Sequence, residues 1–340
     1  MLVSQIMAGA ARGGAETFFE RLVIAFNDAG LAQDIIIRRN PDRAALLRDA
    51  GLRPHELRLG GPLDMLSRWQ LRRHLRQTKP DIVLSWMSRA ASVTPAGDYV
   101  HCARLGGYYN LKYFQTCDHL IGNTQDIVDY LVGDGWPAER AHYLPNFVPD
   151  ISASATARTS LDTPETAPLF LGLGRLHENK AFDVLLDALA KVPDGYLWLA
   201  GVGPLETALK TQASQLGIED RVRFLGWRLD TAALLAASDY VVVPSRIEPL
   251  GNVVLEAWAQ SRPLIAARAK GPAALIKDQQ DGLLVDIDDS GQLAAAMTRL
   301  IEDRNLSEAL AKSGRQRYQA DFTEAAVVRK YLDFFEKIRN

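Results

Sequence analysis

The stretch Ser245–Pro263, SRIEPLGNVVLEAWAQSRP, decides the fold of the second half of the chain. It follows a continuous apolar run, Tyr240–Pro244, which is typical of a strand buried in a parallel sheet. Gly251 or Asn252 is the expected N-cap of a helix that continues to Ala259. A helix that begins directly after a buried strand turns its first N–H groups and its positive dipole end toward the strand's end, and both favour an anion.

Two carboxylates flank this helix start. Glu248 precedes it in the loop, and Glu256 lies about one turn inside the helix. At this spacing the two side chains can meet two different polar groups of one ligand. The alternative is that Glu248 is a loop charge and Glu256 belongs to a solvated helix face, and the stretch alone does not separate these interpretations.

The loop after an earlier strand, Leu169–Gly174, carries two cations, Arg175 and Lys180. At that spacing both can reach one diphosphate, the arginine with its planar fork and the lysine as a point charge. Arg175, Lys180 and the helix start at Gly251 are then three separate groups that favour one anion. Ionised carboxylates beside that anion suit hydroxyl groups, because they can only accept hydrogen bonds. A diphosphate between two hydroxyl-bearing parts is a nucleotide sugar.

Length and composition predict two domains in a reducing compartment. The chain has 340 residues, a net charge of −2 and two cysteines. This length suits two domains, the balance of charge argues against a nucleic-acid partner, and two cysteines form no disulfide framework. The start of the chain resembles a first strand and not a signal peptide, and no apolar run is long enough to cross a bilayer.

Strands and helices alternate along the chain with one composition shift. The predicted domains are 1–150 and 167–322, joined by a Ser/Thr/Ala/Pro-rich linker at 151–166. Both domains are expected to be doubly wound α/β structures with a cleft between them. A final helix at 323–340 is expected to pack back on the first domain.

The first domain opens with a strand, a small-residue loop and a helix. Gly13 and Gly14 lie in that loop and would let the backbone approach a polar group closely, or they make a tight turn only. A second glycine-rich loop, 105–109, brings Tyr108 and Tyr109 to the same sheet edge. His101, in the strand before that loop, either packs in the core or reaches a substrate hydroxyl.

A basic helix is predicted at Met65–Lys79. It carries arginines without an intervening acid, and Leu66 and Trp69 supply apolar side chains. Such a helix can lie on an anionic membrane surface, although a solvated basic face is the more usual explanation.

Other chemistries lack their motifs. The chain has no P-loop, no GxSxG and no zinc-ligand spacing. The run Gly201-Val202-Gly203-Pro204 follows a strand but is not a dinucleotide fingerprint. Asp286 and Asp288 form a DxD pair, for which capping of the next helix, by Asp288, Asp289 or Ser290, is a simpler explanation than a metal.

Several ordered motifs together resemble the retaining glycosyltransferases of family 4, which have the GT-B fold. In the second half they are GRLHENKAFDVLLDAL (174–189), AGVGP (200–204), VRFLGW (222–227) and EPLGNVVLEAWAQSRPLIA (248–266). GGAE (13–16) and LPNFVP (144–149) look similar too, so the resemblance covers nearly the whole chain.

The resemblance implies roles for individual residues. Arg175 and Lys180 would hold the diphosphate, Glu248 would meet the donor sugar and Glu256 the ribose. Catalytic roles are expected for Glu248, Arg175, Lys180 and His101. Donor contacts are expected from Gly13, Gly14, Gly201, Gly203, Phe224, Leu225, Pro249, Leu250, Gly251, Asn252, Val253 and Glu256. The acceptor-side candidates are Arg104, Tyr108 and Tyr109.

Two positions depart from the family pattern. Ala181 replaces a glycine that often follows the lysine, and Pro249-Leu250 replace a small residue and an aromatic, which bears on the sugar pocket. The resemblance implies no metal or other cofactor.

The sequence therefore predicts a retaining transferase that moves a sugar from a nucleotide diphosphate sugar to a glycan or glycolipid, in envelope polysaccharide or lipopolysaccharide synthesis. The expected location is the cytoplasm, at the inner face of the plasma membrane. The alternatives are a non-catalytic nucleotide-sugar-binding protein and another GT-B enzyme, such as a phosphorylase or an epimerase.

Overall fold

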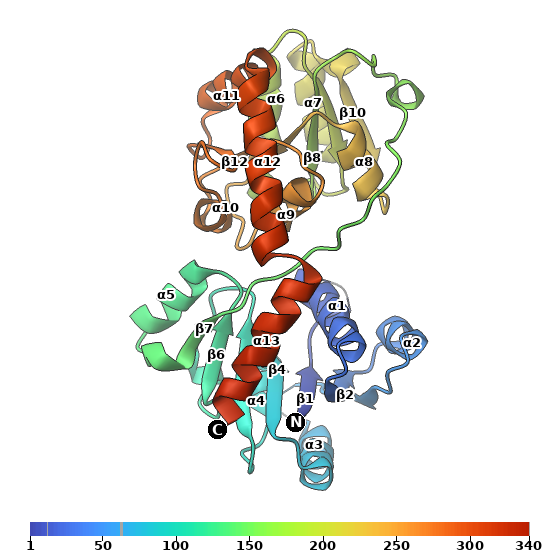
Figure 1. The fold of residues 1–340 in the computed structure, drawn as a ribbon. Helices are drawn as coiled ribbons and strands as arrows, with labels where there is room; N and C mark the ends of the chain where they lie inside the picture. Colours follow the sequence, from blue (N-terminus) through green and yellow to red (C-terminus); the bar gives the residue numbers. More distant parts are fainter. Residues whose placement is uncertain (12, 62–63, 340) are drawn as a thin grey trace. The chain divides into compact units, whose positions relative to one another are not determined.

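The computed structural model describes residues 1–11, 13–61 and 64–339 and divides the chain into two compact units (Figure 1). The first unit contains Met1–Phe147 and the C-terminal stretch that begins at Glu324, and the second contains Val148–Thr323. Each unit is a parallel sheet with buried apolar clusters on both faces. The prediction of two doubly wound α/β domains is confirmed.

In the first unit the described residues form a seven-stranded sheet in the order β3-β2-β1-β4-β5-β6-β7. Its strands are β1 (Leu2–Met7), β2 (Ala32–Arg38), β3 (His55–Leu57), β4 (Ile82–Trp86), β5 (Val100–Leu105), β6 (His119–Gly122) and β7 (Ala141–Tyr143). The helices are α1 (Gly14–Asp28), α2 (Pro41–Asp49), α3 (Met65–Thr78), α4 (Met87–Val93), α5 (Gln125–Gly133) and α13 (Glu324–Arg339). The strand order reverses between β1 and β4, and all paired strands are parallel.

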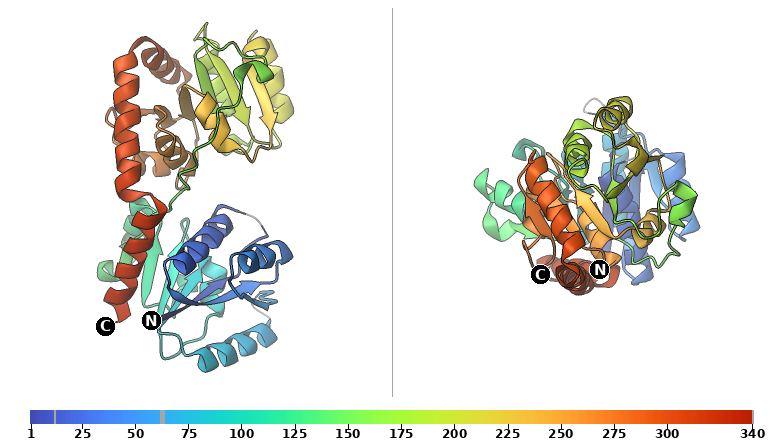
Figure 2. Two further views of the ribbon diagram at one scale, coloured as in Figure 1. Left: turned by 45° about the vertical axis from the view of Figure 1, so that its right-hand side comes forward. Right: turned by 90° about the horizontal axis from the view of Figure 1, so that it is seen from above.

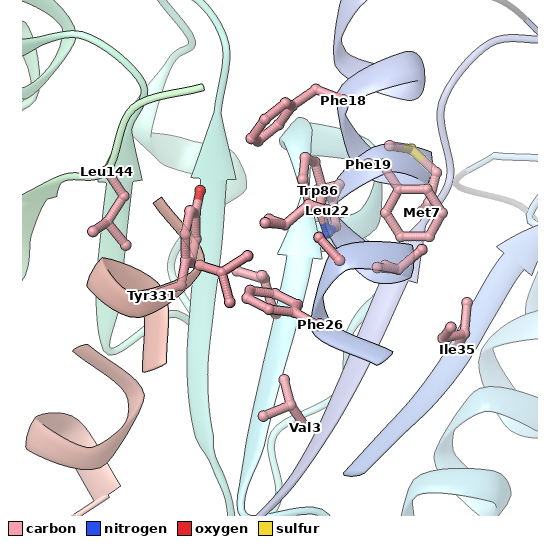
Figure 3. Close-up of a cluster of buried hydrophobic side chains, with 14 of the residues drawn as sticks. Val3, Met7, Phe18, Phe19, Leu22, Phe26, Ile35, Trp86, Leu144 and Tyr331 are labelled. Atoms are coloured by element: carbon pink, nitrogen blue, oxygen red, sulfur yellow. The ribbon is translucent and has the colours of Figure 1, made fainter. Parts of the chain in front are cut away.

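The last helix, α13, packs inside the first unit. The Tyr331 ring stands edge-on to the Phe26 ring of α1, with 5.6 Å between the ring centroids. The Phe335 ring centroid lies 5.8 Å from that of Phe26. Figure 3 shows Tyr331 and Phe26 in the buried cluster that also holds Trp86 of β4. The helix that the sequence places at 323–340 is therefore fixed by aromatic burial against α1.

The segment 151–166, for which the sequence predicts a linker, lies in the second unit. Arg158 donates to the carbonyl of Ala237, 2.7 Å from Nη2, and pairs with Asp239. Trp198 donates to Thr163 Oγ1 at 2.9 Å. The segment 151–166 is therefore a surface strap that is hydrogen-bonded to the second unit.

The second sheet, as described, has six strands in the order β10-β9-β8-β11-β12-β13, all parallel. They are β8 (Leu169–Leu173), β9 (Tyr196–Ala200), β10 (Val222–Gly226), β11 (Tyr240–Val243), β12 (Leu264–Ala267) and β13 (Leu283–Val285). The helices are α6 (Phe182–Leu189), α7 (Glu206–Gln215), α8 (Thr231–Ala237), α9 (Asn252–Ala259), α10 (Lys270–Leu275), α11 (Ser290–Glu302) and α12 (Arg304–Asp321). The order reverses between β8 and β11.

The long helix α12 lies against α9, as Figures 1 and 2 show. The contact centres on Trp258, which is fully buried and donates to the carbonyl of Asp281 at 2.7 Å. A Cβ added at Gly314 of α12 would lie 2.2 Å from Cδ1 of this indole. Only a glycine allows the two helices to approach this closely.

We expect Gly314→Ala to lower the free energy of unfolding of the second unit by about 1–3 kcal/mol, because the added methyl overpacks the indole. Lys312→Ala, an exposed change on the same helix, should alter it by less than about 0.5 kcal/mol. Scanning calorimetry of the full chain measures both. Equal stability of Gly314→Ala and the parent chain would contradict this packing.

Candidate functional site

The switch in strand order between β8 and β11 brings two loops of the second unit together. Val241 pairs in register with Leu171, so the carboxyl ends of the two strands lie side by side. The loop after β8 carries Arg175 and Lys180, and the loop after β11 carries Glu248. In open α/β sheets such a crevice is where ligands bind.

Lys180 and Glu248 form an ion pair across these loops. Both side chains are largely shielded, with 24% of the lysine and 12% of the glutamate exposed. The other oxygen of the carboxylate accepts from the N–H of Gly251 at 3.3 Å. The aliphatic stem of Lys180 passes over Gly174, where a Cβ would lie 3.2 Å from Cε. The pair therefore has a defined position beside the start of α9.

The start of α9 matches the prediction. Gly251 is the N-cap, with φ 84°, and no side chain caps the first turn. Leu250 is buried beneath it, while Pro249, Asn252 and Val253 are half-buried. The N-terminal end of α9 thus lies directly beside the ion pair. Glu256, one turn further on, is half-buried as well.

Arg246, which sequence reasoning missed, fastens the loop that carries Glu248. Its guanidinium pairs with Asp183 of α6, 2.6 Å from Nη2, and with Asp288, 2.5 Å from Nε. It also donates to the carbonyl of Glu178 at 2.9 Å. Asp183 and then Asp288 raise its pKa, so the arginine stays charged. The sequence signal that could have identified Arg246 is its position two residues before Glu248.

Gly271 of α10 was also missed, and it supports the same loop from the other side. Its N–H donates to the carbonyl of Glu248 at 2.8 Å. A Cβ at this position would lie 2.5 Å from that carbonyl oxygen and 2.7 Å from the nitrogen of Leu250. The loop is therefore backed by a glycine that allows backbone-to-backbone contact.

The loops after β9 and β10 complete this edge of the sheet. A Cβ on Gly201 would lie 1.8 Å from the carbonyl oxygen of Gly174, and one on Gly203 would lie 2.2 Å from that of Leu176. Close packing of neighbouring loops thus explains both glycines. Phe224 and Leu225 lie on β10 and pack toward different buried clusters. Whether these four residues touch a donor stays a prediction.

Two further details concern the loop after β8. Arg175 is exposed and makes no ion pair with any residue in the described ranges. Ala181, which stands where the family often has glycine, adopts a left-handed conformation with φ 51°. Such a conformation costs an alanine on the order of 1 kcal/mol, so this departure from the family pattern carries strain.

The acidic run after β13 has structural roles. Asp289 caps α11 by accepting from the N–H of Gln292 at 2.8 Å, as expected for one of three candidates. Asp288 pairs with Arg246, and Asp286 lies 3.7 Å from Nε of Arg268. Both acids of the DxD pair therefore face arginines.

In the first unit the loop after β1 is tied to the first turn of α1. Glu16 is 6% exposed and accepts from the N–H of Ala10 at 2.7 Å. Gly13 is the N-cap of α1, and its carbonyl accepts from Thr17. A Cβ on Gly14 would meet nothing within 4 Å. Whether a ligand approaches the backbone at Gly13 and Gly14 stays a prediction.

The three acceptor-side candidates lie in different environments. Arg104 is 1% exposed, with Cζ 4.5 Å from the Phe18 ring centroid, and it donates to the Tyr331 hydroxyl at 2.9 Å. Its contacts thus serve the core of the unit. Tyr108 lies in the loop after β5 and is 37% exposed, whereas Tyr109 is half-buried.

The prediction that His101 acts at the site is not supported by its position. It lies at the beginning of β5, at the edge of the sheet opposite the ligand-binding ends of the strands. The ring is buried, with Nε2 2.9 Å from Ser85 Oγ and Nδ1 3.0 Å from the Thr116 carbonyl. The packed-core interpretation is therefore the correct one.

Burial lowers the pKa of His101 to about 4, although the Thr116 carbonyl and Asp118 act in the opposite direction. We expect the folded ring to titrate near pH 4, against about 6.5 in the unfolded chain. Its contribution to stability is then complete above pH 6.5 and is lost as the pH falls toward 4. Histidine side-chain NMR measures the titration, and a midpoint near 6.5 would contradict this environment.

Each of the two units matches a family of known proteins. Residues 12–150 match the family model described as Glycosyltransferase Family 4, and residues 154–317 match the model Glycosyl transferases group 1. The chain is 37% identical over 330 residues to the lipopolysaccharide core biosynthesis glycosyltransferase LpsE of Rhizobium meliloti (strain 1021), covering 94% of this chain and 95% of that one. It is 36% identical over 328 residues to LpsD of the same organism, covering 96% and 95%.

Among solved structures, Anabaena Alr3699/HepE in complex with UDP superimposes with a TM-score of 0.87 at 20% identity, covering 99% of this chain and all of that one. Its complex with UDP-glucose gives a TM-score of 0.80 at the same identity and coverage. This likeness confirms the predicted fold class.

Proposed function

The chain belongs to glycosyltransferase family 4, with the GT-B fold, and from this membership we propose that it transfers a sugar from a nucleotide diphosphate sugar to a hydroxyl group of an acceptor. The first unit is assigned to the acceptor and the second to the donor. Transfer retains the configuration at the anomeric carbon and needs no metal. The observation that carries the proposal is the Lys180–Glu248 pair at the β8/β11 switch point.

The donor assignment rests on the combination of groups at one edge of the second sheet. Arg175, Lys180 and the N-terminal end of α9 are all suited to a diphosphate. We assign Glu248 to a hydroxyl of the donor sugar and Glu256, which lies on α9, to the ribose. The UDP and UDP-glucose complexes of Alr3699/HepE support a donor of this class, with uridine as the first base to test.

The proposed chemistry follows from where charge develops. As the bond from the anomeric carbon to the diphosphate breaks, positive charge grows on the sugar and negative charge on the phosphate. Arg175, Lys180 and the α9 start stabilise the departing diphosphate with groups that are already oriented. The leaving phosphate oxygen accepts the proton of the attacking hydroxyl, so no separate base is required. Glu248 orients the sugar through its hydroxyl groups.

For the acceptor, we propose a glycan or glycolipid of the lipopolysaccharide core. The relatives LpsE and LpsD bear that name and align along nearly all of this chain. Because such an acceptor is linked to a lipid, we propose that the enzyme acts at the cytoplasmic face of the plasma membrane. No helix in the described ranges combines the length and apolar character needed to cross a bilayer.

Contact with the membrane surface is proposed for α3. Met65, Leu66 and Trp69 at its start are 70%, 64% and 58% exposed. Arg73 stacks over the Trp69 ring, 5.6 Å from its centroid. Exposed apolar side chains among arginines are the pattern that binds an anionic bilayer surface.

We expect Lys180→Ala and Glu248→Ala each to remove most transfer while leaving the fold intact, because each removes a group that meets the reacting donor. The effect should be about 100-fold or more in kcat, the usual size for a group aimed at developing charge. Lys191→Ala, an exposed lysine of the same unit that donates to Ser290, should retain full activity. Release of nucleotide in the presence of lipopolysaccharide acceptor measures turnover, and near-normal rates in both site variants would refute the proposal.

We expect the parent chain to co-sediment with phosphatidylglycerol vesicles and not with phosphatidylcholine vesicles. Leu66→Glu/Trp69→Glu should abolish this binding, because it places two carboxylates in the apolar patch. Trp227→Glu changes another exposed tryptophan, 73% accessible in the second unit, and should bind like the parent chain. Undiminished sedimentation of the double variant would rule out α3 as the contact.

A further inference from the structure

The first unit contains a basic cavity that the proposed reaction has not used. Its volume is about 370 Å³, within the range of small-molecule sites. It lies where β1 and β2 end, between the loop Gly9–Ala11 and the start of α2, and three of its lining residues are Arg38, Arg39 and Arg43. This is again the carboxyl edge of a parallel sheet, where α/β units bind ligands.

One wall of the cavity is built by a buried arginine. Arg43 is 2% exposed, pairs with Glu20 at 2.7 Å, and donates from Nη2 to the carbonyls of Ala10 and Ala11, both at 3.2 Å. Asn40 donates to the Ala11 carbonyl as well, at 3.1 Å. The loop after β1 is therefore held against the start of α2 by side chains that are themselves fixed.

Positive charge is in excess among the residues that line the cavity. Arg38 and Arg39 form no ion pair with any described residue, and Nη1 of Arg43 is buried without a hydrogen-bond partner in the same part of the chain. Asp42 is the one acid among the described lining residues. The first turn of α2, capped by Asn40, adds the positive end of a helix dipole. Two unpaired guanidinium groups at a cavity mouth favour an anion.

The cavity also adjoins the loop that precedes α1, within the unit that is assigned to the acceptor. Ala10 lines it and donates to Glu16 in the first turn of α1, directly after Gly13 and Gly14. A ligand seated here would therefore lie along the loop that opens α1. The diphosphate of the donor has its own cations in the second unit, so a second anion, carried by another molecule, is the occupant that the charges require.

We propose that this cavity binds an anionic substituent, a phosphate monoester or a carboxylate, on the saccharide acceptor. The term acceptor rests on the proposed function, whereas the anion site rests on the cavity alone. Arg38 and Arg39 are the specificity-determining residues, and Arg43 is a positioning residue that keeps the loop in place. The enzyme thereby selects acidic saccharides over neutral ones.

The test measures the thermal midpoint of the full chain with glucose 6-phosphate, glucuronate or glucose at constant ionic strength. A ligand that binds the folded state raises the midpoint. Either acidic sugar should raise it and glucose should not, and the more effective acid identifies phosphate or carboxylate as the group. The Arg175→Gln/Lys180→Ala variant should show the same shift, because the donor site is not involved.

Variants of the cavity decide the assignment. Arg39→Gln, at an exposed position, should weaken binding about tenfold, the effect of losing one charge-assisted hydrogen bond, and Arg38→Gln/Arg39→Gln should abolish the shift. Arg53→Gln, an exposed arginine in the connection from α2 to β3 and outside the cavity, should bind like the parent chain.

The inference is overturned if neither acid shifts the midpoint, if the double cavity variant keeps the shift, or if the donor-site variant loses it. Failure of the proposed function has a different signature, because it would leave nucleotide sugars without effect whatever the acidic sugars do.

Discussion

The parallel pairing of β8 with β11 is the constraint on which the candidate site depends. These strands are separated by more than sixty residues in the chain, yet their register places the ends of both at one point of the sheet edge. The ion pair of Lys180 with Glu248 can form only because of that adjacency. A cation from one loop, a carboxylate from the other and the start of α9 then face the same space. This is the general property of a switch point, realised here with groups suited to a charged and hydroxylated ligand.

Backbone packing keeps these groups in place. Gly271 supports the Glu248 loop through a direct hydrogen bond, and Gly201 allows the loop after β9 to touch the one after β8. Arg246 ties the Glu248 loop to α6 and to Asp288. None of these residues needs to meet a ligand to matter, because a site that stabilises developing charge works only if its dipoles do not have to reorganise.

Much of this could be predicted from the sequence, and the limits have physical causes. The buried strands, the N-cap at Gly251 and the capping role of Asp289 are local features that periodicity and capping preferences reveal. Arg246 and Gly271 were missed because their partners lie far away in the chain and are set by strand order. For His101 the sequence left core packing and substrate contact open, because Ser85 and the Thr116 carbonyl come to lie beside the ring only when the sheet has formed.

The most direct measurement of the central claim, that the second unit holds a nucleotide diphosphate sugar, is a thermal-shift comparison of UDP-, GDP- and ADP-sugars with the corresponding nucleoside monophosphates. The account predicts that one of the diphosphate sugars raises the unfolding midpoint and that its monophosphate does so much less, because Arg175, Lys180 and the α9 start are suited to the diphosphate. No shift with any diphosphate sugar, or an equal shift with the matching monophosphate, would contradict it.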